Sequence, residues 1–262
     1  MNYISRNLEK VVLEVTKEYP VVLVTGPRQV GKTTMLQKLM EGTERSYVSL
    51  DDLNERNIAK NDPELFLQLH KPPVLIDEVQ YAPELFTYIK IHVDKNHMPG
   101  GFWLTGSQVF KLMSGVQESL AGRVAVLSLT SLSQAEICGG KMEPFTIDLE
   151  ALSARSKERK QADTRDIFEQ IFRGSMPVIV SGQNSNSHIF YSSYLTTYVE
   201  GDVKELSDAI DSLKFLRFIT AVAARSGQLL NVADIVRDAD INQKQAKDWL
   251  GILETLGIIF YL

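Results

Sequence analysis

"YPVVLVTGPRQVGKTT", residues 19–34, decides the fold of this chain. It contains the pattern G-x-x-x-x-G-K-[ST] between a strand signal and a helix signal. The fixed places of the pattern are held by Gly26, Gly31, Lys32 and Thr33. The residues before the loop are apolar and β-branched, which is typical of a buried parallel strand, and "KTTMLQKLM" after it has apolar residues at helical spacing. Strand, glycine-rich loop and helix therefore follow one another in the order of a phosphate-binding loop.

The chemistry of this loop predicts a nucleotide site. Its glycines let backbone N–H groups turn toward an anion, and the helix N-terminus adds a partial positive charge at the same place. Lys32 is expected along the β- and γ-phosphates, and the hydroxyl of Thr33 is expected to bind Mg²⁺. The residues expected to line the nucleotide are Gly26, Pro27, Arg28, Gln29, Val30, Gly31, Lys32, Thr33 and Thr34. ATP is preferred over GTP by default, because the sequence has no N-K-x-D guanine reader.

A second cluster follows the apolar run in "PPVLIDEVQ", where a strand delivers Asp77 and Glu78 to its carboxyl end. Sites in parallel sheets lie at that end. Asp77 is expected to hold Mg²⁺, often through a water molecule, and Glu78 to orient and polarise the attacking water. The alternative is that the two acids cap the following helix.

Two weaker signals lie further along the chain. "GFWLTGS" ends a strand at Thr105 and Ser107, which are expected to contact the γ-phosphate or the water, unless they only cap a helix. "ESLAGRVAVLSL" places Arg123 at the entry of a strand, as a candidate to stabilise transition-state charge in cis or from a neighbouring subunit. The alternative for Arg123 is a surface pair with Glu118.

Composition predicts a soluble globular protein of 262 residues, of which 44% are apolar and 23% charged. The apolar runs are too short for a membrane helix, and the N-terminus lacks the apolar stretch of a signal peptide. With Cys138 as the only cysteine, no intrachain disulfide is possible, and a cytoplasmic location is the default expectation. A net charge of −5 argues against wholesale wrapping in nucleic acid.

The order of the elements predicts an α/β fold followed by helices. Up to about residue 132, short buried strands alternate with helical patterns, which indicates a parallel sheet flanked by helices. We expect a P-loop domain at 1–138, a linker and helical lid-like region at 139–210, and a winged-helix-like domain at 211–262. In the last segment, a short helix, a tight turn at Asp240–Asn242 and a second helix precede an apolar strand that would begin a wing.

Together, "GPRQVGKTT", "VLIDEVQYAPELF", "FWLTGSQ", "ESLAGRVAVLSLTSLSQAE" and "AARSGQLLN" resemble a large family of prokaryotic AAA+ ATPases of the STAND-like kind. The resemblance covers nearly the whole chain. It implies Walker A roles for Lys32 and Thr33, Walker B roles for Asp77 and Glu78, a sensor at Ser107 or Thr105, and a finger or sensor arginine at Arg123. Arg28 and Gln29 also match the family's loop.

The resemblance also gives an expectation about the end of the chain. Members of this family usually continue past the winged helix into a nuclease-like fold, whereas this chain stops at "LGIIFYL". We therefore expect a shortened version whose last strand, residues 257–262, has an open edge and promotes self-association.

Three functions compete at this point. The first is a Mg²⁺-dependent ATPase that acts as a nucleotide-driven switch and could assemble as a homo-oligomer. The second is a DNA-binding module regulated by nucleotide through its winged helix, although that helix pair serves equally well for a protein partner. The third, a small-molecule kinase, is disfavoured because the sequence shows no obvious acceptor-binding segment.

Overall fold

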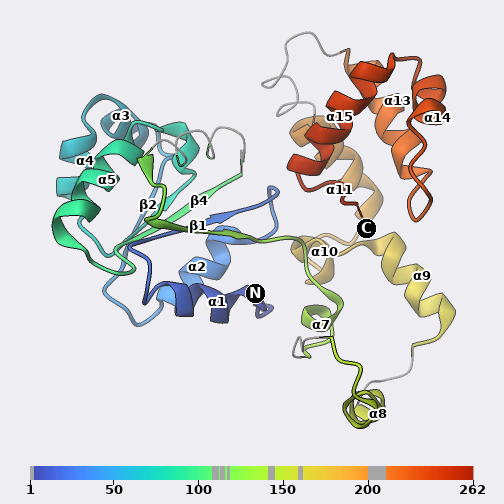
Figure 1. The fold of residues 1–262 in the computed structure, drawn as a ribbon, viewed down its shortest axis with the longest axis horizontal. Helices are drawn as coiled ribbons and strands as arrows, with labels where there is room; N and C mark the ends of the chain where they lie inside the picture. The colour runs from blue at the N-terminus through green and yellow to red at the C-terminus, as the bar shows by residue number, and fades with distance from the viewer. Residues whose placement is uncertain are drawn as a thin grey trace.

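The computed structural model describes residues 3–107, 112, 116, 119–140, 145–158, 162–199 and 211–261. All its strands lie before residue 129, and the described residues beyond them form helices and connecting loops. Figure 1 shows the α/β half at one end and the later helices at the other, joined by the segment that leaves the last strand. The predicted change from alternating strands and helices to helices alone is confirmed.

The strands form one parallel sheet of five in the order β2-β3-β4-β1-β5. They are β1 (Val21–Thr25), β2 (Ser46–Ser49), β3 (Val74–Asp77), β4 (Phe102–Gly106) and β5 (Val124–Ser128). β1, β3 and β4 are buried along their whole length, as expected for central strands covered on both faces. Because β4 lies between β1 and β3, its carboxyl end lies between the glycine-rich loop and the paired acids.

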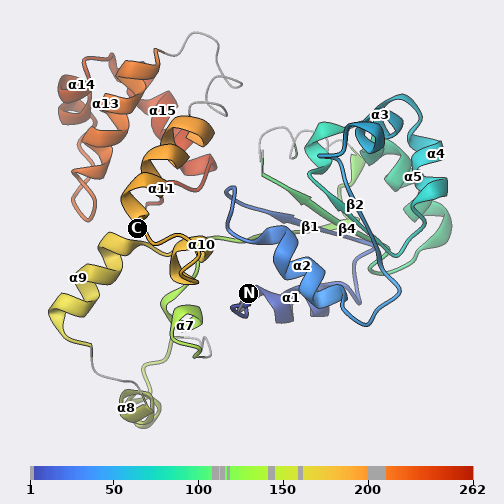
Figure 2. The ribbon, with the colours of Figure 1, turned by 180° about the vertical axis from the view of Figure 1, so that it is seen from behind.

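Helices cover both faces of the sheet, as the two opposite views show (Figures 1 and 2). They are α1 (Leu8–Val15), α2 (Lys32–Met40), α3 (Leu53–Asn61), α4 (Pro63–Leu69), the 3₁₀ turn η1 (Val79–Tyr81) and α5 (Leu85–Asn96). The short helix α7 (Gln134–Ile137) follows the last strand and lies apart from the sheet (Figure 1). Alternate residues of β1 point to opposite faces, so Val21 and Leu23 join the core that includes residues of α3, α4 and α5. Val22 and Val24 join a second core with residues of α1, α2 and a later helix, α10.

The second half of the described chain consists of helices. They are α8 (Leu149–Glu158), α9 (Thr164–Arg173), α10 (Pro177–Val180), α11 (Ser187–Tyr194), the π-helical turn η2 (Leu195–Val199), α13 (Ser212–Ala223), α14 (Val232–Ala239) and α15 (Gln243–Thr255). A separate core joins α13, α14 and α15, in which the rings of Phe215 and Phe218 pack edge-on against Trp249. The helix-turn-helix order is as predicted: Asp240 ends α14 in a left-handed conformation, and Asn242 caps α15.

The predicted apolar strand after α15 is wrong for the residues described there, 257–261. They have no strand conformation. The backbone N–H of Ile258 bonds instead to the carbonyl of Leu253 at 2.9 Å, and both Ile258 and Ile259 pack on the C-terminal core. The segment therefore closes the end of α15 and does not begin a wing, which removes the basis for an open strand edge; Leu262 lies outside the described residues.

In the described part of the chain, no helix is both long and apolar enough to cross a membrane.

Candidate functional site

The glycine-rich loop leaves β1 at a point that only glycine can occupy. Gly26 has φ of 137°, and a Cβ there would lie 2.0 Å from the carbonyl oxygen of Leu129, at the end of the neighbouring strand. Gly31 is left-handed and forms the N-cap of α2. Between them, Gln29 has a positive φ of 62°, which is uncommon for a residue with a side chain. The backbone is therefore held in a tight loop around the start of α2.

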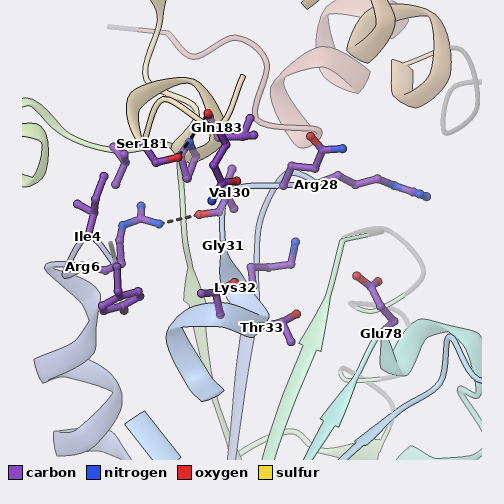
Figure 3. A pocket seen from close by; sticks show the side chains of 16 residues that line it. Ile4, Arg6, Arg28, Val30, Gly31, Lys32, Thr33, Glu78, Ser181 and Gln183 are labelled. Atoms are coloured by element: carbon purple, nitrogen blue, oxygen red, sulfur yellow. Dashed lines mark hydrogen bonds between the residues drawn. The ribbon is translucent and has the colours of Figure 1, made fainter. Parts of the chain in front are cut away.

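The side chain of Lys32 lies under this loop. It is 5% exposed, and its Nζ donates to the carbonyls of Gly26 and Pro27, each at 2.9 Å. Figure 3 shows Lys32 and Thr33 side by side at the start of α2, below the loop. A buried ammonium beside the backbone N–H groups of a helix start is suited to a polyphosphate.

Asp77 connects three of the predicted site residues. The Thr33 hydroxyl donates to its Oδ1 at 2.6 Å, and the Thr105 hydroxyl donates to the same oxygen. Tyr47, which sequence reasoning did not single out, donates from its hydroxyl to Oδ2 at 3.3 Å. Burial, and after it the charge of Asp77, raise the pKa of this tyrosine. Side chains from β2, β4 and the start of α2 thus meet at the carboxylate that ends β3.

This donor set fits Mg²⁺. A hydroxyl and a carboxylate are hard oxygen ligands, and Mg²⁺ usually takes one or two such protein ligands and completes its shell with waters and phosphate oxygens. Among the described residues no group of three or more His, Cys, Asp or Glu is placed to hold a metal. The arrangement therefore suits an ion that arrives with a phosphate ligand better than one held in a closed protein site.

Glu78 lies next to this carboxylate in a strained backbone conformation, with φ of 56°. Its N–H donates to the Thr105 hydroxyl at 3.1 Å. Its carboxylate Oε2 accepts from the Ser107 hydroxyl at 3.3 Å and from the side-chain amide of Gln80. The Glu78 side chain points toward the space beside Lys32 (Figure 3). Thr105 and Ser107 therefore contact the two acids in this structure.

The loop and Glu78 line a cleft of about 440 Å³. Its other lining residues are Tyr3, Ile4, Arg6, Leu132, Pro177, Val178, Ser181 and Gln183. These side chains come from the N-terminal segment, the loop after β5 and the α10 region, and none was predicted. Apolar side chains dominate this wall, whereas the wall built by α2 and β3 is polar. The sequence offered no motif for them, because they come from three separate segments.

Arg6 supports the loop from its outer side. It is buried, donates from Nη1 to the carbonyl of Val30 at 2.7 Å and from Nη2 to the carbonyl of Thr130 at 2.7 Å, and pairs with Glu136 at 3.2 Å. Burial raises the pKa of Glu136, but the N–H groups of Asn7 and Ser133 and the charge of Arg6 outweigh it, so the pKa is lowered overall. The N-terminal segment is thereby fixed to the nucleotide loop.

Of the two alternatives for Arg123, the structure argues against contact with the γ-phosphate within its own chain. Arg123 precedes β5, and the first residue of that strand pairs with Val21, at the opposite end of β1 from the loop. The two ends of β1 are four residue steps apart, which is roughly 13 Å. Its guanidinium instead forms a fork with Asp94, at 2.5 and 3.1 Å. The alternative partner, Glu118, lies outside the described residues, and a role in a neighbouring subunit stays a prediction.

Comparison with known proteins agrees with this geometry. Residues 18–138 match a family described as an AAA domain. The structure is similar to that of a Walker-type ATPase of Pyrococcus abyssi, with a TM-score of 0.57 and 16% identity, over 97% of this chain and 90% of the other. At this identity the similarity shows the fold, which is that of a P-loop NTPase.

The other matches are less informative about function. Residues 164–262 match a family described as a domain of unknown function, which says nothing about a winged helix or a nuclease-like fold. Uncharacterised proteins of Mycobacterium bovis and Mycobacterium tuberculosis are each 29% identical over 236 residues, or 89% of this chain. The chain spans about half of their length, 47%.

Proposed function

We propose that this protein binds ATP with Mg²⁺ in the cleft, hydrolyses it, and uses the nucleotide state as a switch. One observation carries the proposal: Lys32, Thr33 and Glu78 line a single cleft, and the Thr33 hydroxyl donates to Asp77 beside it. The match of residues 18–138 to AAA domains supports the same activity.

Binding begins with the phosphates. The loop supplies backbone N–H groups, and Lys32 exchanges its bonds to the Gly26 and Pro27 carbonyls for bonds to phosphate oxygens. Thr33 and Asp77 would hold Mg²⁺, which would neutralise phosphate charge. Thr105 keeps the Asp77 carboxylate oriented toward Thr33.

Hydrolysis requires a group that accepts a proton from water. We assign this role to Glu78, because its carboxylate points into the cleft beside Lys32 (Figure 3). The water oxygen bonds to the γ-phosphorus, the bond to the β–γ bridging oxygen breaks, and ADP and phosphate leave. In this proposal Ser107, which contacts Glu78, takes the sensor position.

The apolar wall of the cleft is suited to the adenine base of the nucleotide. Ile4, Leu132 and Val178 offer flat apolar contact beside the polar groups of Ser181 and Gln183. This combination suits a purine, whose faces are apolar and whose edge carries hydrogen-bonding groups.

The switch rests on contacts between the loop and the C-terminal helices. The Tyr194 hydroxyl donates to the carbonyl of Arg28 at 3.3 Å, and Tyr194 packs on both the α/β core and the C-terminal core. At the turn after α15, Gly257 lies so close to Pro27 that a Cβ would be 2.9 Å from its Cγ. The same short loop would therefore contact the phosphates on its inner side and the C-terminal helices on its outer side. We propose that residues 139–210 connect the P-loop domain to those helices.

The C-terminal helices do not favour the DNA-binding alternative. Arg225 pairs with Asp238, Arg237 with Asp234 at 3.0 Å, and Lys214 with Asp240 at 3.5 Å. Cations already paired within the domain offer less charge to a phosphate backbone. We therefore propose a protein partner, either another subunit of this chain or a different protein, as the receiver of the switch.

Nucleotide titration tests the proposal. We expect purified protein to bind a fluorescent ATP analogue in the presence of Mg²⁺, to bind the GTP analogue more weakly, and to be unaffected by duplex DNA. Val178→Glu, which places a charge on the apolar wall, should weaken binding while leaving the Lys32 side intact. If Val178→Glu bound the ATP analogue as tightly as the wild type does, and neither protein distinguished the two nucleotides, the assignment of the adenine base to that wall would be contradicted.

A further inference from the structure

Gln80 contacts Glu78, the residue that we propose as the general base. It is the middle residue of η1, is 5% exposed, and donates from Nε2 to Oε2 of Glu78. The Ser107 hydroxyl donates to the same oxygen at 3.3 Å. No hydrogen bond from a described residue reaches the other oxygen, Oε1. One oxygen of Glu78 is therefore held from two sides, and the other is left for a ligand in the cleft.

The orientation of the Gln80 amide is set by this contact. Its own Oε1 is buried and has no hydrogen-bond partner among the described residues. Turning the amide over would place that oxygen against the Glu78 carboxylate, where two acceptors repel each other. An unpaired buried carbonyl is unfavourable, so a side chain kept only for packing would be better served by leucine or methionine. The amide N–H is what distinguishes glutamine at this position.

The backbone of Glu78 adds to the constraint. Its left-handed conformation is held by two bonds, from its own N–H to Thr105 and from the N–H of Tyr81 to its carbonyl, both at 3.1 Å. With the backbone fixed, rotation about the side-chain bonds is the remaining freedom of the carboxylate. The Gln80 amide removes that freedom.

We propose that Gln80 is a positioning residue for hydrolysis: it holds Oε2 of Glu78 so that Oε1 faces the attacking water. The inference rests on the proposed ATPase activity. Gln80 does not contact the nucleotide, because it does not line the cleft, so it acts on the rate through Glu78 and leaves nucleotide affinity unchanged.

The test uses Gln80→Leu and Gln80→Met, which keep the size of the side chain and remove the amide. We expect kcat to fall about tenfold or more, with KM and the Kd of the fluorescent ATP analogue unchanged within about twofold. The Tm should stay the same or rise, because the unpaired carbonyl is removed. Gln68→Leu, on the exposed side of α4, is the matched control and should change neither rate nor affinity.

A double variant separates positioning from a general structural effect. If Gln80 acts only through Glu78, the variant Glu78→Gln with Gln80→Leu is no slower than Glu78→Gln alone. An unchanged kcat in both Gln80 variants overturns the inference, as does a fall in kcat accompanied by equal losses of affinity and Tm. A wild-type protein that binds ATP without turnover overturns the proposed hydrolysis, and the inference with it.

Discussion

The hydroxyl of Thr33 donates to Oδ1 of Asp77 over 2.6 Å, although 44 residues separate them in the sequence. The contact joins the start of α2, which follows β1, to the carboxyl end of β3. In the sheet, β4 lies between β1 and β3. Two oxygen ligands of the proposed Mg²⁺ site therefore lie side by side. Thr33→Val should reduce the Mg²⁺ dependence of nucleotide binding, measured as the ratio of the Kd values with Mg²⁺ and with EDTA. A ratio equal to that of the wild type would contradict the metal assignment.

Glu78→Gln should separate binding from chemistry. The amide keeps the size of the side chain but does not accept the proton of the attacking water, so turnover is expected to fall by about 10²- to 10⁴-fold. The Kd for ATP should stay within about twofold of the wild type. Single-turnover measurements with excess protein check this directly, and parallel losses of binding and turnover would give Glu78 a structural role.

Glu136→Gln should destabilise the protein in a pH-dependent way. Removing one partner of a buried ion pair leaves Arg6 uncompensated and costs about 3–5 kcal/mol at pH 7. Because the pKa of Glu136 is lowered in the folded state, its contribution is present above its unfolded pKa of 4.5 and is lost as the pH falls through the native pKa. Urea unfolding should therefore show a smaller difference between variant and wild type near pH 3 than at pH 7. A difference independent of pH would mean that the carboxylate charge is not what Arg6 needs.

Tyr194→Phe and Gly257→Ala probe the contact between the loop and the C-terminal helices. Tyr194→Phe removes the bond to Arg28, whereas Gly257→Ala places a Cβ against Pro27 at a residue with φ of 67°. In the wild type, ATP should change the rate at which protease cleaves between the two halves, and both variants should weaken that change. Tyr191→Phe, whose hydroxyl bonds instead to the carbonyl of Arg173, is the control. The switch is refuted if the variants respond to ATP as the wild type does.

Arg123→Ala tests the remaining role of this arginine. If it acts on a neighbouring subunit, a mixture with Lys32→Ala protein should recover part of the hydrolysis that each variant lacks alone. If it serves only the pair with Asp94, then Asp94→Asn should give the same small loss of stability, with full turnover. Full activity of Arg123→Ala alone would end the subunit proposal.

The sequence predicted the polar wall of the site and missed the apolar one. The loop and the two acids follow strands with a strong apolar pattern, and the carboxyl ends of parallel strands meet at one edge, so their proximity could be foreseen. Ile4 and Val178 come from segments without a motif, and only the packing of the chain brings them to the loop. Arg123 was misplaced although the same rule applies to it, because a residue at the entry of a parallel strand lies at the edge opposite the site.

The C-terminal strand failed for a different reason. A short apolar run such as residues 257–261 is compatible with a strand or with a segment that closes a helix. In the structure, the backbone N–H groups of Ile258 and Ile259 bond to the carbonyl of Leu253, so the segment closes the helix. The hydrophobic pattern alone does not predict these bonds.

Phosphate release from ATP by wild-type and Lys32→Ala protein tests the central claim most directly. Lys32 is the side-chain cation that the loop places beneath the phosphates, so its loss should lower turnover by at least about 100-fold, while the buried cores, which it does not join, keep the fold intact. The account predicts Mg²⁺-dependent release by the wild type and none above background by a folded Lys32→Ala variant. Equal release by both proteins, with unfolding curves that coincide, would contradict it.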